Sequence, residues 1–218
     1  DREGYLKKLY SHIWVFDLAT KKADQITKSH FDDSSPVWSP DGARLAFVGR
    51  RGQDVERSED SDIYVVEARP GAEPAKLTTF VGTNGGRPAW SPDGQFVAYL
   101  QGDESKFSAY QQETLAIVPS AGGQSRLLTA ALDRPVADPL VWTADGKALL
   151  FQVADDRVTY IGRTTTAGGA VEKLTSGRRT VSNLSRGTDG ALTLVAGTAV
   201  EFHEVCAFEN GAFRKLTR

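Results

Sequence analysis

The sequence predicts an all-β fold, assembled from a four-stranded antiparallel unit that recurs along the chain. Trp-Ser-Pro-Asp-Gly at 38–42 returns at 90–94, Trp-Thr-Ala-Asp-Gly follows at 142–146, and a reduced copy ends at 188–190. An apolar residue followed by Thr closes each unit. No segment shows a sustained apolar period of 3.6 residues, so almost no helix is expected. Four short strands per unit of about 45 residues are typical of β-propeller blades.

The repeated pentapeptide predicts a β-hairpin. Ser39 opens a turn, and Pro40 presets the φ that the second turn position needs. Gly42 is expected at positive φ, where it lets the next strand pair in register. Trp38 ends the incoming strand, and its ring is expected to fill the layer between neighbouring sheets. We therefore interpret the repeat as building the fold, with no chemistry of its own.

Taken in order, the predicted elements begin with half a blade at 12–28, whose strands at 12–18 and 24–27 follow no such hairpin. Four full blades come next, at about 34–79, 87–130, 138–176 and 179–218. The closing pair therefore occurs once more than the hairpin, as Ile26-Thr27, Leu77-Thr78, Leu128-Thr129, Leu174-Thr175 and Leu216-Thr217. The range 1–218 is predicted to be a single propeller domain, or a fragment of one, with about four and a half blades.

Composition excludes several functional classes. The net charge of −2 over 218 residues argues against a broad nucleic-acid surface. No apolar run approaches the roughly 18 residues that cross a bilayer, so no membrane contact is expected. Cys206 is the single cysteine, which excludes an internal disulfide and a multi-cysteine metal site. Because it lies in an apolar strand, we expect it to be a small buried hydrophobe.

The blades resemble TolB-type propeller repeats, whose units read roughly P-x-W-S-P-D-G, I-A-F, I-Y-V and L-T. More specifically, the chain resembles the propeller of prolyl oligopeptidase family serine peptidases, on the acylaminoacyl-peptidase side. The stretches that carry this resemblance are Gly4-Tyr5-Leu6, His12-Ile13-Trp14-Val15-Phe16-Asp17, Phe31-Asp32-Asp33-Ser34-Ser35-Pro36, Ser61-Asp62-Ile63-Tyr64-Val65-Val66 and Arg214-Lys215-Leu216-Thr217.

That resemblance implies a function for the parent protein. In the family, the propeller is joined to an α/β-hydrolase domain with a Ser-Asp-His triad, caps the active site and restricts which peptides enter. The implied partners are the hydrolase domain of the same protein and the peptide substrates of the parent enzyme, and a homo-oligomer is left open. The catalytic residues are expected outside this chain, as hydrolase sequence after Arg218, and the expected location is the cytoplasm.

The chain itself offers no catalytic motif. No Gly-x-Ser-x-Gly nucleophile elbow occurs, and Gly82-Thr83-Asn84-Gly85-Gly86 is interpreted as a loop between blades. The three histidines, His12, His30 and His203, show no metal-binding spacing. His203 is expected in a strand, on a partly wet face. We therefore assign no catalytic, cofactor-binding or metal-binding residue, and expect no cofactor.

Charged connections are the remaining candidates for contact with a partner or substrate. Loops at 50–60 and 101–112 occupy the same place in their blades and should emerge on one rim. Arg178-Arg179 lies between successive blades, and Asp32-Asp33 is expected to be solvated and to cap a turn. Two other functions stay open: a TolB-like module that binds a protein, and a propeller enzyme such as a lyase or lactonase, which the scarcity of histidine disfavours.

Overall fold

The computed structural model describes residues 9–51, 58–104 and 112–217. Over these ranges the chain forms five antiparallel sheets, one of two strands and four of four strands. The described residues contain no helix, and thus none able to cross a bilayer. This confirms the predicted all-β, partial-propeller fold class.

The two-stranded sheet pairs β1 (Trp14–Phe16) with β2 (Ala23–Gln25). Each four-stranded sheet is a meander in which consecutive strands pair. Blade I comprises β3 (Asp33–Trp38), β4 (Arg44–Gly49), β5 (Asp62–Glu67) and β6 (Ala75–Lys76). Blade II comprises β7 (Asn84–Trp90), β8 (Phe96–Gln101), β9 (Thr114–Pro119) and β10 (Arg126–Leu127).

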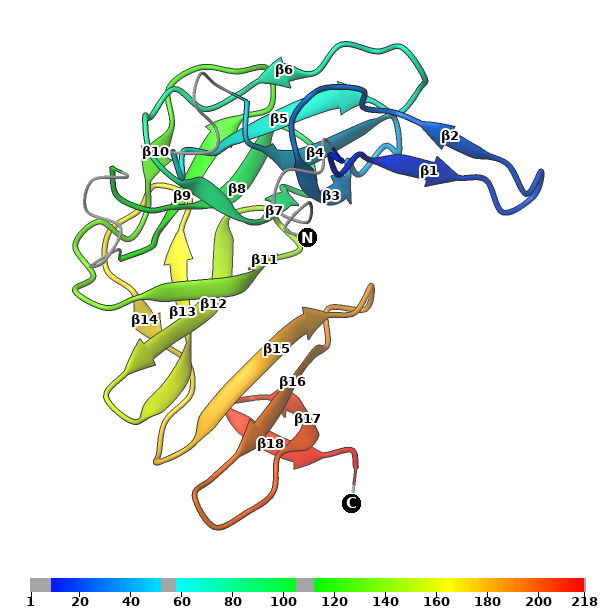
Figure 1. The fold of residues 1–218 in the computed structure, drawn as a ribbon. Coiled ribbons are helices and arrows are strands. Elements are labelled where there is room, and N and C mark those ends of the chain that lie inside the picture. The colour runs from blue at the N-terminus through cyan, green and yellow to red at the C-terminus, as the bar shows by residue number, and fades with distance from the viewer. Residues whose placement is uncertain (1–8, 52–57, 105–111, 218) are drawn as a thin grey trace, which may run out of the picture.

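Blade III comprises β11 (Val136–Trp142), β12 (Ala148–Asp155), β13 (Val158–Thr165) and β14 (Glu172–Lys173). Blade IV comprises β15 (Thr180–Arg186), β16 (Leu192–Gly197), β17 (Glu204–Glu209) and β18 (Ala212–Lys215). In Figure 1 the sheets follow one another along an arc, with β1–β2 at one end and β15–β18 at the other. The first strands β3, β7, β11 and β15 contact each other in succession, and they form the inner wall of the arc.

The core is divided into layers between adjacent sheets. Phe47 faces the β1–β2 sheet, Tyr99 faces blade I, and Phe151 faces blade II, and each of these side chains is fully buried. A fourth cluster joins blades III and IV around Ile161 and Leu194. A strand that packs against neighbouring sheets on both faces has a continuous run of apolar residues, because neither face is exposed to solvent. Leu115–Val118 is such a run.

The recurring hairpin has the same hydrogen bonds in its first three copies. In the first, Ser39 Oγ donates to Asp41 Oδ1 at 2.5 Å and accepts from the Arg44 amide at 2.9 Å, while Asp41 Oδ1 also accepts from the Ala43 amide. Gly42 has φ of +68°, as predicted, in a region that favours glycine. In the fourth copy Gly187 replaces the hydroxyl residue, so only the carboxylate bond to the Ala191 amide is kept.

Two of the three repeated tryptophans fill the layer between blades. Trp142 Nε1 donates to the Ala89 carbonyl of the preceding blade at 3.0 Å, and Trp90 Nε1 donates to the Val37 carbonyl at 3.3 Å. Trp38 differs from the prediction, because half of its surface is exposed. Among the described residues, the sheet that precedes it has only β1 and β2, which correspond to the outer strands of a blade, so no described inner strand packs against Trp38.

The Thr of the closing pair has a structural task that its repetition did not reveal. In every unit its hydroxyl oxygen accepts an amide hydrogen from the strand that pairs with the closing strand, or from the residue just before it, as Thr129 does from Leu115 at 3.0 Å. The same bond joins Thr27 to Ile13, Thr78 to Ile63, Thr175 to Ile161 and Thr217 to Val205. This bond holds the end of the fourth strand to the third strand, next to the few residues over which the two strands pair.

The arc ends in two blade faces that no described residue covers. At the last blade, Val205 is 39% exposed, whereas the matching residues Ile63, Leu115 and Ile161 are fully buried. At the first sheet, Trp14 is 57% exposed and Phe16 is 54% exposed. Both faces are therefore apolar surfaces of the kind that pack against a neighbouring blade elsewhere in the arc.

Candidate functional site

The connections between blades and the hairpins between second and third strands meet at one rim, here called the connection rim. The Ser61 amide donates to the Gly82 carbonyl at 3.1 Å, and the Thr159 amide donates to the Arg179 carbonyl at 3.3 Å. The described ends of both long loops lie here, as the sequence predicted. Their central parts, 52–57 and 105–111, lie outside the described residues.

Asp33 and Arg51 form a shielded ion pair at this rim. Both guanidinium nitrogens that face Asp33 donate to it, at 2.8 Å from Nη2 and 3.2 Å from Nε. The Asp33 side chain is fully buried, and the guanidinium lies over the rings of Tyr64 and Phe47. The expectation of a solvated Asp33 is wrong, because this residue begins β3 and points into the blade. Asp32 is exposed, as predicted, but it accepts from the distant Ser11 amide at 2.7 Å and not from an amide of its own turn.

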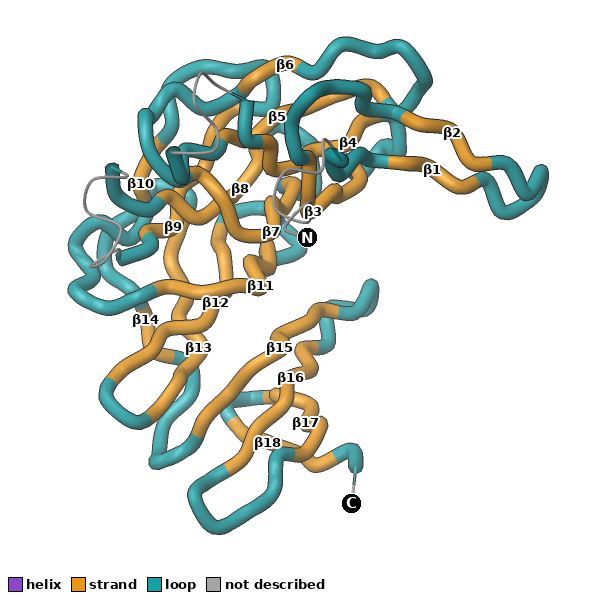
Figure 2. The backbone as a smooth tube through the Cα atoms, viewed as in Figure 1, coloured by secondary structure: helices purple, strands orange, loops and turns teal. Residues whose placement is uncertain are grey.

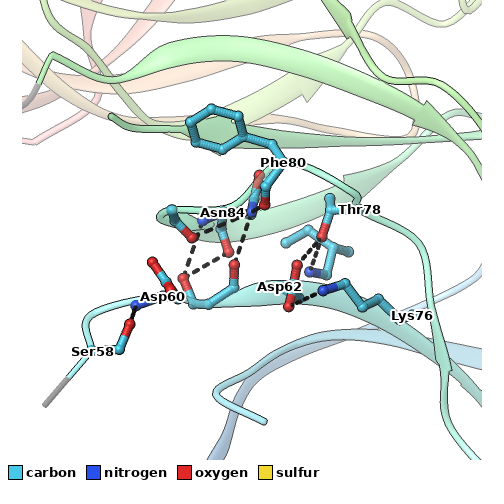
Figure 3. A network of polar contacts seen from close by, with 10 residues as sticks. Ser58, Asp60, Asp62, Lys76, Thr78, Phe80 and Asn84 are labelled. Atoms are coloured by element: carbon cyan, nitrogen blue, oxygen red, sulfur yellow. Dashed lines mark hydrogen bonds and ion pairs between the residues drawn. The ribbon is translucent and has the colours of Figure 1, made fainter. Parts of the chain in front are cut away.

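Asn84 anchors the connection between blades I and II (Figure 3). Its side-chain amide donates to the Ser61 and Phe80 carbonyls, both at 2.9 Å, and its backbone exchanges hydrogen bonds with Ser61. Reading 82–86 entirely as a loop is wrong, since β7 begins at Asn84 and Gly85 pairs with Leu100. The Asn84 side chain supplies donors to two backbone carbonyls of the connection. The local sequence does not predict these bonds, because Ser61 is distant along the chain.

The inner wall carries one acidic side chain that the sequence analysis did not single out. Asp138 Oδ2 accepts from the Arg87 amide at 2.6 Å, while Oδ1 is buried without a partner among the described residues. Burial raises the pKa of Asp138, and the bond from Arg87 partly opposes that rise. A Cβ on Gly86 would lie 2.9 Å from Oδ2, so this position needs glycine for Asp138 to approach.

The three histidines lie in separate parts of the structure. His30 packs edge-on against Tyr10, and His12 begins the segment that leads into β1. His203 is in the loop before β17, not in a strand, and its Nε2 lies 2.8 Å from Thr180 Oγ1. The described residues hold no cluster of three or more potential metal ligands. Cys206 is buried in β17, as expected.

A pocket of 690 Å³ opens at the connection rim between blades III and IV. Three segments line it: the β12–β13 turn, the connection that contains Arg178 and Arg179, and the β16–β17 loop that ends at His203. The sequence analysis identified Arg178-Arg179 but not the pocket. The other two walls come from hairpins of different blades. These hairpins lie side by side only because the two sheets pack together, which the sequence does not show.

Comparisons with known proteins agree with this architecture. Residues 5–196 match the model of the TolB beta propeller domain. The chain is 29% identical over 194 residues to the uncharacterized peptidase YuxL of Bacillus subtilis, covering 84% of this chain and 27% of that protein. It is 25% identical over 150 residues to dipeptidyl-peptidase 5 of Porphyromonas gingivalis, covering 68% and 22%. The chain thus spans about a quarter of the length of these relatives.

Solved structures share the fold. A puromycin-hydrolyzing peptidase of Mycobacterium tuberculosis matches with a TM-score of 0.71 at 14% identity, over 95% of this chain and 35% of that one. TolB from Acinetobacter baumannii matches with a TM-score of 0.63 at 22% identity, over 94% and 48%. Because the family model covers most of its length, the chain belongs to the TolB β-propeller domain family.

Proposed function

We propose that this chain is the non-catalytic propeller portion of a serine peptidase, in which it caps an α/β-hydrolase active site and admits only small or unfolded peptides. The main support for the proposal is the match to the uncharacterized peptidase YuxL. The match covers 84% of this chain but only 27% of that peptidase. The sequence supports it as well, since these 218 residues contain no nucleophile elbow. The catalytic serine would then belong to another part of the parent protein.

The two uncovered faces of the arc fit the same proposal. Trp14 and Phe16 at one end, and Val205 and Leu216 at the other, expose apolar side chains that correspond to buried positions in the other blades. Further blades of the parent protein would cover both faces and close the ring over the hydrolase. A cytoplasmic location is part of the proposal, and fractionation of the source cells tests it.

Active-site labelling tests the assignment directly. The full-length gene product is treated with a fluorophosphonate, which reacts with activated serines, and the labelled peptide is identified by mass spectrometry. We expect one labelled serine in a Gly-x-Ser-x-Gly sequence outside residues 1–218. A full-length protein that takes up no label, or is labelled within these residues, contradicts the peptidase assignment.

The second candidate is a TolB-like module that binds a protein. The match to the TolB beta propeller domain favours it, as does 38% identity over 82 residues to the Tol-Pal system protein TolB of Alcanivorax borkumensis. The apolar side chains of Val81 and Phe202, exposed at 73% and 92%, would serve such binding. This function predicts an unlabelled full-length protein and a secretory signal upstream of Asp1.

A further inference from the structure

The pocket between blades III and IV concentrates arginine side chains. Arg157 comes from the β12–β13 turn, and Arg178 and Arg179 come from the connection into β15. Arg157 and Arg178 are exposed and make no ion pair within the described part of the chain. Their charges are therefore available to a ligand.

Arg179 adds an observation of a different kind. Its guanidinium lies 4.4 Å from the centre of the Phe213 ring, and its Nε is buried with no acceptor among the described residues. The stacking holds the planar group in place at the wall of the pocket. An arginine fixed in this way is pre-organised to donate two parallel hydrogen bonds to a carboxylate.

The acidic residues of the pocket do not cancel this positive charge. Asp155 is held by Arg134, with 2.8 Å between Oδ1 and Nε, and Lys173 lies 3.8 Å from its other oxygen. The hydrogen bond from Arg134 lowers the pKa of Asp155, which is consistent with a carboxylate paired to arginine. Asp156 is exposed in the turn and makes no ion pair with another described residue, so one such carboxylate lines the pocket with three arginines.

The third wall of the pocket supplies apolar contact. Thr198, which lines the pocket, caps the β16–β17 loop by accepting from the Val200 and Glu201 amides, and Ala199 follows it in the pocket wall. Val158 and Ala199 line the pocket together with the arginines, which suits a ligand in which an anionic group adjoins an apolar one.

We propose that this pocket binds carboxylates that carry a neighbouring apolar group, as the C-terminus of a peptide ending in an aromatic or aliphatic residue does. The carboxylate is held by Arg178 and Arg179, and the apolar group lies against Val158 and Ala199. The site does not depend on the peptidase assignment, because a propeller that only binds partners could use the same pocket.

N-acetylphenylalanine and its uncharged amide are a matched pair of probes, and binding to the full-length gene product is measured by calorimetry or by ligand-observed NMR. We expect the acid to bind and the amide to bind at least about tenfold more weakly, since the two differ only in the charged group. Arg178→Gln and Arg179→Gln should each weaken binding of the acid about tenfold. Val158→Ser, at an apolar residue that lines the pocket, should weaken it severalfold without creating affinity for the amide.

Arg163→Gln is the control, because Arg163 is an exposed arginine of blade III that pairs with Glu172 outside the pocket. It should leave the affinity unchanged within about twofold. If Arg179→Gln disturbs folding because the contact with Phe213 is lost, Arg178→Gln still tests the binding site, since Arg178 is exposed. Equal affinity for acid and amide, or unchanged affinity in both Arg178→Gln and Arg179→Gln, overturns the proposal, and so does the absence of binding by the acid.

Discussion

At the scale of single residues, small polar side chains fix the backbone in this propeller. The closing Thr of each unit receives an amide hydrogen from the third strand, and the turn Ser receives one from the strand after the hairpin. These residues therefore recur in the sequence because they supply hydrogen-bond partners to backbone amides, and the recurrence does not indicate a catalytic role.

The closing Thr can be tested at Thr129, which is almost fully buried. Thr129→Val keeps the shape but leaves the Leu115 amide unpaired in the interior, so the free energy of unfolding should fall by about 1–3 kcal/mol. Thr129→Ser keeps the hydroxyl and should recover most of that loss. Denaturant unfolding of both variants measures the difference, and equal destabilisation would show that the hydrogen bond is unimportant.

The turn carboxylates make a prediction about pH. The bonds from Ser91 and the Gln95 amide lower the pKa of Asp93 below its ordinary value of 3.8. A carboxyl with a depressed folded-state pKa contributes stability above its unfolded pKa, and this contribution is lost as the pH falls through the folded-state pKa. Ser91→Ala should raise the pKa of Asp93 in an NMR titration; an unchanged pKa would rule out Ser91 as the main cause.

The buried ion pair makes a third prediction at this scale. Asp33→Asn leaves Arg51 without its counter-charge in a shielded position, and should lower the free energy of unfolding by about 3 kcal/mol. Glu172→Gln breaks the exposed pair with Arg163 and should cost less than about 1 kcal/mol. Denaturant unfolding at neutral pH compares the two, and similar losses would contradict a special role for the Asp33 site.

At the scale of elements, the repeated hairpin and its tryptophan join one blade to the next. Trp142 fills the layer against blade II and donates to the Ala89 carbonyl. Trp142→Ala removes both the packing and the bond, so unfolding should become easier by about 3–5 kcal/mol. Val81→Ala, at an exposed apolar position, should change stability by less than about 0.5 kcal/mol. Melting curves of the two variants measure the difference. Unchanged stability of Trp142→Ala would contradict a stabilising role for the tryptophan.

The sequence was sufficient for the strands, because alternating and continuous apolar runs report directly which faces are buried. It was also sufficient for the turn at Gly42, since that φ is a local property. It misplaced Asp33 and Asn84, whose polar types suggest solvent, because their partners Arg51 and Ser61 are brought near only by strand pairing. The pocket at Arg179 was missed for the same reason, since two of its walls are hairpins of different blades.

At the scale of the whole molecule, the arc exposes an apolar face at each end. Figure 2 shows that every sheet is joined to the next by a loop. The buried clusters lie between adjacent sheets, so each blade depends on its neighbours for burial. If further blades of the parent protein cover the ends, Phe16 should be protected from hydroxyl-radical oxidation in the full-length gene product. Phe202, which lies in a loop, is the exposed reference of the same residue type. Equal oxidation of the two would contradict the closed ring.

The proposed restriction of access to a peptidase site by the propeller is tested most directly by substrate size. The full-length gene product is given one cleavable sequence twice, as a short free peptide and as an insert in a loop of a folded carrier protein. We predict that kcat/KM for the folded carrier is lower by about a hundredfold or more, and that unfolding the carrier restores cleavage. Equal values of kcat/KM for the free peptide and the folded carrier would contradict a gating propeller.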